Sequence, residues 1–185
     1  MKWFLCLITK FEKTILMKTL KSLSLMLMFI LSVLMVSAQK SANTNIDKIT
    51  AAYLGVKNAL AAGNGTAAGA KGKELFEALS AQPEKGLKPD QAKLLGNYLD
   101  KLKFDSRHIS ETTAIDHQRE HFADLSKNMY AVLEGLKVNT STLYVQYCPM
   151  KKAYWLSETS AIKNPYYNDE MTTCGSTKAI LAPAK

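Results

Sequence analysis

The side chains of this 185-residue chain that are best suited to chemistry are four sulfur ligands near the C-terminus. Cys148 precedes Met150 by two residues, and Met171 precedes Cys174 by three. Thiolate and thioether sulfurs are soft ligands, so this set predicts a Cu(I) or Ag(I) site, with zinc as a further candidate. The two cysteines also suit a disulfide, because exported proteins commonly pair their cysteines. A disulfide removes the thiolates that a metal needs, and the spacing alone leaves both interpretations open.

The three histidines form a second set of candidate ligands, all between His108 and His121. His117 and His121 are four residues apart, so a helix would place them on neighbouring turns of one side, where they could bind a metal together. His108 is expected near the end of the preceding helix, and antiparallel packing could bring it to the same place. The alternative is that all three are surface histidines in a polar segment. We include His121 and His117 among the candidate metal ligands.

No enzyme motif accompanies these ligands in the sequence. There is no Cys-x-x-Cys pair, no Gly-x-Ser-x-Gly elbow and no phosphate-binding glycine loop, and the histidine spacing differs from the His-Glu-x-x-His of zinc peptidases. We therefore predict a protein without catalytic activity. A thiol-based redox enzyme is a third hypothesis, which requires a depressed thiol pKa.

The N-terminal region has the pattern of a secretory signal peptide. An apolar run over residues 23–36 follows two lysines and precedes a small-residue cleavage site that ends at Ala38. The run is shorter than the about 20 apolar residues that a membrane-spanning helix needs. We expect cleavage after Ala38 and a periplasmic or secreted protein, with membrane contact only through an uncleaved leader. Met17 is the expected start of this leader, so residues 1–38 comprise a signal peptide with extra N-terminal residues.

The charge of the chain argues against a nucleic-acid partner. Five lysines and one glutamate in residues 1–38 account for +4 of the formal net charge of +8. The remaining excess is modest and contains no long run of like charges, so we expect no nucleic-acid binding.

The elements that must position the candidate ligands are predicted to be helices over residues 39–138. Apolar residues recur every three or four positions in the first helix, which Gly63-Asn-Gly65 ends. Pro89 is suited to the first turn of the third helix, and Thr113 to the cap of the fourth. Short loops favour antiparallel neighbours, so we predict an all-α fold, an up-down four-helix bundle.

Residues 139–185 differ in composition from the helical region. Aromatic residues and turn formers crowd together there, and Thr142 to Tyr147 is rich in aromatic and β-branched residues, as a short strand would be. We expect a small loop-rich or β-hairpin C-terminal cap packed on the bundle, with its aromatic side chains as local core.

Several short motifs lie between about Tyr53 and Cys174: Gln118-Arg119, Phe122, Leu125-Ser126, Cys148-Pro149-Met150, Trp155-Leu156, Asn164-Pro165-Tyr166, Met171 and Cys174-Gly175. In these motifs the chain resembles a bacterial periplasmic helical domain family of unknown function. Members of that family occur alone or fused to periplasmic adaptor subunits of heavy-metal efflux pumps. The resemblance implies a non-catalytic accessory role in copper or silver handling, with such an adaptor as a partner. The alternative is a disulfide-clamped interaction module that docks on an adaptor or envelope partner without binding metal.

Overall fold

A computed structural model of the chain describes residues 45–81, 83–167 and 171–184. The chain divides into two compact units, Met1–Gln39 and Lys40–Lys185, and all described residues belong to the second. The predicted leader, its start at Met17 and its cleavage site after Ala38 therefore lie outside the described residues. Within the described part, no helix combines the length and the apolar character needed to cross a bilayer.

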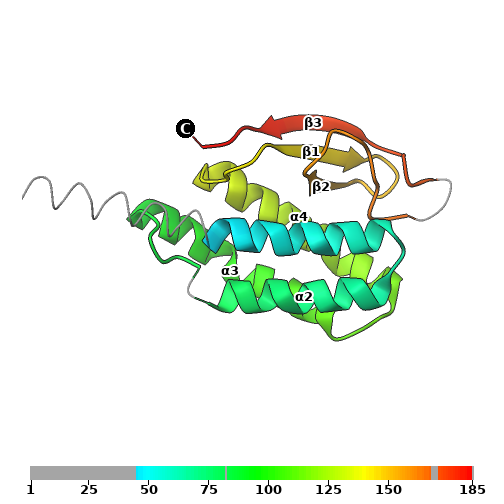
Figure 1. Cartoon of the computed structure of the whole chain (residues 1–185), viewed down its shortest axis with the longest axis horizontal. Coiled ribbons are helices and arrows are strands. Elements are labelled where there is room, and N and C mark those ends of the chain that lie inside the picture. The colour runs from blue at the N-terminus through cyan, green and yellow to red at the C-terminus, as the bar shows by residue number, and fades with distance from the viewer. Residues whose placement is uncertain (1–44, 82, 168–170, 185) are drawn as a thin grey trace, which may run out of the picture. The chain divides into compact units, whose positions relative to one another are not determined.

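Four helices and a small antiparallel sheet make up the described fold (Figure 1). The first helix covers residues 45–61, and it is followed by α2 (Gly65–Ser80), α3 (Pro89–Ser110) and α4 (Ile115–Leu136). The strands are β1 (Leu143–Cys148), β2 (Ala153–Ser157) and β3 (Ser176–Leu181). A mostly helical fold with a strand cap, as predicted, is confirmed, although the cap is a three-stranded sheet.

The helix boundaries follow from local capping chemistry. Gly63 ends the first helix with φ 69°, and the Asn64 side chain accepts a hydrogen bond from the Ala67 amide to begin α2. Pro89 occupies the first turn of α3, as predicted. The expectation that Thr113 caps α4 is wrong, because Ala114 is the N-cap residue and Thr112 Oγ1 accepts a hydrogen bond from the Ala114 amide.

The helices enclose the hydrophobic core with the apolar faces that the sequence pattern predicts. Five residues of the first helix share one buried face: Ile46, Ile49, Tyr53, Val56 and Leu60. On α4, Phe122 and Met129 of the seven-residue repeat are buried in the same core. Burying such a side chain contributes about 1.5–3 kcal/mol, so the two faces together supply much of the driving force for folding.

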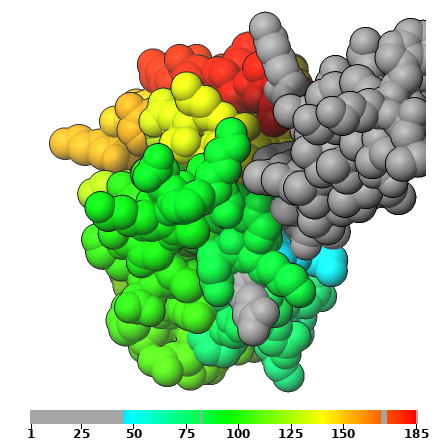
Figure 2. Space-filling model, turned by 90° about the vertical axis from the view of Figure 1, so that its left-hand side faces the viewer, coloured from blue at the N-terminus to red at the C-terminus, as the bar shows by residue number. Residues whose placement is uncertain are grey.

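The sheet has the strand order β2-β1-β3, with both pairings antiparallel. Tyr147 of β1 lies opposite Tyr154 of β2 and opposite Ser176 of β3. Trp155 and Leu156 of β2 are buried against the helices, and the space-filling view shows the C-terminal segment, in yellow to red, covering one side of the green helices (Figure 2).

A buried polar contact joins the first helix to α4 and the sheet. The Tyr53 hydroxyl lies 2.8 Å from Ser126 Oγ and accepts a hydrogen bond from the Leu156 amide at 3.0 Å. Burial strongly raises the pKa of Tyr53, so the phenol stays neutral and can serve both partners. This contact fixes β2 against the helices.

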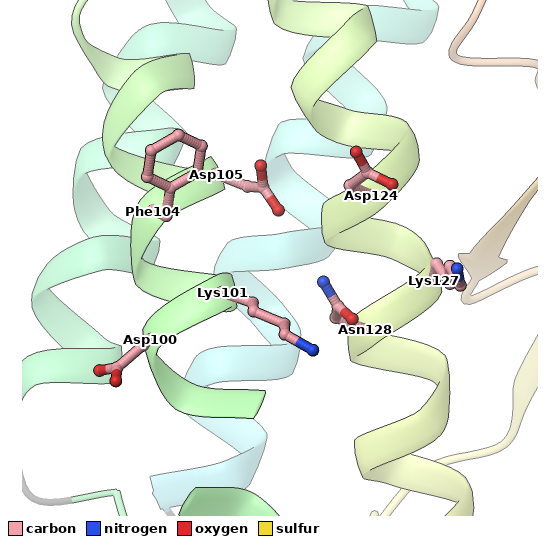
Figure 3. A pocket seen from close by; sticks show the side chains of 7 residues that line it. All are labelled: Asp100, Lys101, Phe104, Asp105, Asp124, Lys127 and Asn128. Carbon is pink, nitrogen blue, oxygen red and sulfur yellow. The ribbon is translucent and has the colours of Figure 1, made fainter. Parts of the chain in front are cut away.

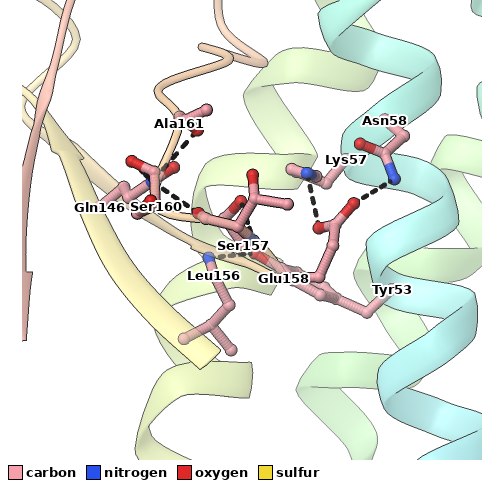
Figure 4. A network of polar contacts seen from close by, with 10 residues as sticks. Tyr53, Lys57, Asn58, Gln146, Leu156, Ser157, Glu158, Ser160 and Ala161 are labelled. Atoms are coloured by element: carbon pink, nitrogen blue, oxygen red, sulfur yellow. Dashed lines mark hydrogen bonds and ion pairs between the residues drawn. The ribbon is translucent and has the colours of Figure 1, made fainter. Parts of the chain in front are cut away.

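An ion pair at the end of β2 adds a second link to the first helix (Figure 4). Lys57 Nζ lies 2.8 Å from Glu158 Oε2, and Asn58 Nδ2 donates to Glu158 Oε1 at 2.9 Å. Burial outweighs the nearby carboxylate and lowers the pKa of Lys57. Burial alone would raise the pKa of Glu158, but the hydrogen bonds from Lys57 and Asn58 outweigh it and lower that pKa.

Candidate metal centre

The end of α3 and the beginning of α4 bring the three histidines together. His108 lies in the last turn of α3, and His117 and His121 lie on the first turns of α4. Only residues 111–114 separate the two helices, so these ends stay close in space. One ligand atom from each imidazole lies within 4.8 Å of the other two. We call these three residues the histidine centre.

The rings of the histidine centre pack directly on one another. The rings of His108 and His121 are stacked, with centroids 4.7 Å apart and planes 9° apart. The His117 ring meets the His121 ring edge to face at 4.8 Å. The Phe104 ring lies 4.3 Å from the His108 ring and 5.8 Å from the His121 ring, so it flanks the centre on the α3 side.

Each imidazole has a carboxylate beside its Nδ1 atom. His121 Nδ1 lies 3.1 Å from Asp105 Oδ1, within hydrogen-bond distance. For the other two, the nearest carboxylate oxygens are farther away: Glu111 at 3.9 Å from His108 Nδ1 and Glu120 at 3.8 Å from His117 Nδ1. Metal-binding histidines commonly donate one ring N–H to a carboxylate and bind the ion with the other nitrogen. The arrangement therefore leaves Nε2 of His121 as its candidate donor, and either ring nitrogen of His108 and His117 can serve.

Asp105 is the most constrained of these carboxylates. Its side chain is only 7% exposed, and burial raises its pKa, while the hydrogen bond and charge of His121 oppose that rise. An ionised Asp105 can only accept a hydrogen bond, so it places the His121 proton on Nδ1 and frees Nε2. A cation bound to His121 would further stabilise the buried carboxylate through their opposite charges.

The spacing of the centre fits a transition metal after a small adjustment. Nitrogen ligands at about 2.0–2.1 Å from a tetrahedral zinc ion lie roughly 3.3 Å from one another. The 4.8 Å limit in the structure therefore requires closure by about 1.5 Å, and the His108 ring must also rotate out of its stacked position on His121 for both nitrogens to point at one ion. Imidazole nitrogen suits Zn²⁺, Cu²⁺ and Ni²⁺.

An open groove between α3 and α4 adjoins the histidine centre (Figure 3). It has a volume of about 510 Å³ and shares Phe104 and Asp105 with the surroundings of the centre. In Figure 3 the Asp105 and Lys101 side chains point from α3 toward α4, and Asn128 points back from α4. The other residues that line the α3–α4 groove are Asp100, Asp124 and Lys127.

The structure places the predicted sulfur ligands in the C-terminal cap. Cys148 ends β1, is buried, and accepts a hydrogen bond from the Lys151 amide at Sγ. Met150 is 63% exposed in the turn between β1 and β2. Met171 and Cys174 are half-buried, and the Cys174 amide donates to the Met171 carbonyl.

The strand register brings the two cysteines to the same end of the sheet. Tyr147 pairs with Ser176, so the chain positions that follow this pair are Cys148 on one strand and Gly175 then Cys174 on the other. Both cysteines are free thiols in the structure. The cluster of three candidate ligands found among the described residues is the histidine centre, and it includes neither cysteine.

Sequence reasoning anticipated part of this centre. The i, i+4 spacing predicted the pairing of His117 with His121, and helix packing suggested the approach of His108. It missed Asp105, whose contact with His121 spans 16 residues and crosses from α3 to α4. A usable signal was present, since Asp105 precedes His108 by three residues and so lies on the same side of α3.

Comparisons with known proteins extend over the helices. Residues 49–141, half of the chain, match the family described as "Protein of unknown function (DUF3347)". The match contains the histidine centre and Asp105, and it ends before β1 and the four sulfur ligands. No curated protein and no solved structure matches the chain.

Proposed function

Since this chain belongs to the DUF3347 family of proteins of unknown function, we propose its role from its own geometry: it binds a transition-metal ion without catalysis. The observation that carries the proposal is the histidine centre, in which three ligand nitrogens lie within 4.8 Å and each imidazole has a carboxylate beside Nδ1. Zn²⁺ and Cu²⁺ are the ions we expect there, because the donors are imidazoles.

The metal would be held by His108, His117 and His121, with Asp105 orienting His121. His117 is 49% exposed and His108 31% exposed, so an ion can reach the centre from solvent. The surrounding carboxylates attract cations, and the hydrogen bond between Asp105 and His121 Nδ1 makes that imidazole a better donor. These properties support reversible loading, as a protein that stores or delivers metal requires.

A second candidate function is soft-metal binding at the sulfur ligands of the cap. The register of β1 and β3, which directs Cys148 and Cys174 to one end of the sheet, favours it. Cu(I) or Ag(I) would bind to a subset of Cys148, Met150, Met171 and Cys174. The competing possibility is a Cys148–Cys174 disulfide in an interaction module that holds no metal, and closure of that loop would stabilise the fold by roughly 3.5 kcal/mol.

The cellular setting of this role remains the one that the sequence predicts. We propose an exported accessory domain for heavy-metal resistance, arranged as an up-down bundle with a strand cap. Its proposed partner is the periplasmic adaptor subunit of an efflux pump, to which it would deliver copper or silver. The signal-peptide pattern and the family resemblance support this setting.

The proposal is tested by competition of the purified protein with a chromophoric chelator for Zn²⁺. A Cys148→Ser, Cys174→Ser double variant serves as the parent, so that neither cap thiolate competes with the imidazoles for Zn²⁺. We expect binding of one ion, and a loss of affinity on His121→Ala larger than the about 10–100-fold cost of losing a carboxylate that hydrogen-bonds to a metal ligand. Lys127→Ala, an exposed position farther along α4, is the matched control and should leave the affinity unchanged. Equal affinity in the His121→Ala and control proteins would refute the proposal.

The cap is tested separately by titration of the reduced protein with Cu(I). We expect the cysteine double variant to lose Cu(I) affinity while His121→Ala retains it. Mass spectrometry of the protein purified without reductant then distinguishes the alternative. A complete disulfide with no bound metal would favour the docking module.

A further inference from the structure

The histidine centre provides three protein ligands, and this number leaves one coordination position of a bound ion open. The cluster found among the described residues has three members. Zinc sites that have three protein ligands keep a water or another exogenous ligand in the fourth position, whereas closed structural sites use four protein ligands. Asp105 is already held by His121, which makes it an orienting partner for the imidazole instead of a fourth ligand.

The histidine centre is accessible from solvent on the side of Phe104. His117 and His108 are partly exposed, and Phe104 beside them is 50% exposed. The Phe104 ring contacts both the His108 and His121 rings, so it forms a wall of the centre that offers no donor atom. Phe104 and Asp105 also line the α3–α4 groove, so the groove adjoins the histidine centre on this side.

We infer that the metal held by the histidine centre keeps an exchangeable fourth position beside Phe104, and that small monodentate anions bind the metal there. This inference rests on the proposed metal binding and adds the class of ligand that completes the site. The bond formed is a dative bond from the anion to the metal, and the water molecule that it replaces leaves unchanged. Such a position also lets an incoming donor atom bind before the imidazoles release the ion, which is a route for metal transfer.

The test uses Co²⁺ as a visible reporter in the cysteine double variant and azide as the anion. Tetrahedral Co²⁺ has absorption bands in the visible region that change when a ligand is exchanged. We expect Co²⁺ to bind with a tetrahedral spectrum, and azide to shift these bands in a saturable way. Phe104→Leu, which keeps an apolar wall, should respond to azide like the parent protein.

Phe104→His is the decisive variant, because it offers a fourth imidazole at a position whose ring already contacts two ligand rings. We expect this variant to bind Co²⁺ more tightly and to lose the response to azide. Bound Co²⁺ that is insensitive to azide in the parent protein would overturn the open position while leaving metal binding intact. A Phe104→His protein that responds like the parent would overturn its placement beside Phe104. Failure of the parent to bind either Co²⁺ or Zn²⁺ would overturn both this inference and the proposed function.

Discussion

Replacing Asp105 by Asn should separate metal affinity from protein stability. Asp105 is 7% exposed and its carboxylate lies 3.1 Å from His121 Nδ1. Asn has nearly the same shape, and its side-chain oxygen can still accept a hydrogen bond from the imidazole. The substitution therefore removes the negative charge and retains the orientation of His121.

The expected loss of metal affinity follows from the role of such carboxylates. Loss of a partner behind a metal-binding histidine typically weakens metal binding by about 10–100-fold, or about 1.4–2.7 kcal/mol. Because Asn keeps the hydrogen bond, we expect Asp105→Asn to weaken metal binding by an amount near the lower end of this range, about 10-fold. Asp105→Ala also removes the hydrogen bond that orients the His121 ring, so its loss of metal affinity should be near the upper end, about 100-fold.

Although Asp105→Asn should weaken metal binding, the metal-free variant should be at least as stable as the metal-free parent protein. Burial raises the pKa of Asp105, which means that the folded state disfavours its ionised form relative to the unfolded chain. Asn carries no charge to desolvate, so the free energy of unfolding of metal-free Asp105→Asn should equal or exceed that of the parent protein.

Two assays check this pair of effects on the same proteins. Chelator competition gives the Zn²⁺ affinity, and urea unfolding in the presence of a strong chelator gives the metal-free stability. Asp124→Asn is the control, because Asp124 lines the same groove from α4 but is exposed. Its effect on affinity should be smaller than that of Asp105→Asn. Unchanged zinc affinity in Asp105→Asn, or a large loss of metal-free stability, would refute the proposed role of this carboxylate.

Three further predictions concern the fold. Glu158 has a lowered pKa, so its stabilising contribution is present above about pH 4.3 and is lost as the pH falls through the folded-state pKa. The free energy of unfolding, measured as the pH is lowered, should therefore fall less steeply in Glu158→Gln than in the parent protein. Tyr53→Phe leaves the buried Leu156 amide without its acceptor and should cost about 1–3 kcal/mol in urea unfolding. Gly72→Ala should destabilise by about 1–3 kcal/mol, because its Cβ would lie 2.9 Å from Ile109 Cγ2 and 3.1 Å from backbone atoms of α3. Gly96→Ala is the matched control, since no neighbouring atom lies within 4 Å there, and it should raise the free energy of unfolding by the gain in helix propensity, about 1 kcal/mol.

The helices could be predicted from the sequence because their signals are local. The apolar face of the first helix, from Ile46 to Leu60, repeats with helical spacing, and burial of that face is confirmed. Pro89 marked the beginning of α3 for the same reason, since a proline fits the first turn.

The third strand could not be predicted because its signal is not local. β3 is largely exposed at the edge of the sheet and has no continuous apolar face. It is defined by its pairing with β1, in which the paired residues are 29 to 38 positions apart in the sequence. A hairpin of β1 and β2 was therefore the most that residues 139–185 could indicate.

One part of the candidate site could be predicted from local sequence signals, whereas the other part depends on contacts between elements. The spacing of His117 and His121 is a property of one helix, and the sequence suffices to pair them. The approach of His108 and the hydrogen bond between His121 and Asp105 depend on how α3 packs on α4. Whether the four sulfur ligands of the cap bind metal stays a prediction.

The most direct test of the account is NMR observation of the imidazole nitrogens during addition of Zn²⁺. The chain has three histidines, so a long-range ¹H–¹⁵N spectrum of the cysteine double variant contains a small number of resolvable signals. We predict that Nε2 of His121 and one ring nitrogen each of His108 and His117 shift to metal-bound positions at one equivalent of zinc. Binding of one equivalent with these three signals unchanged would contradict the histidine centre.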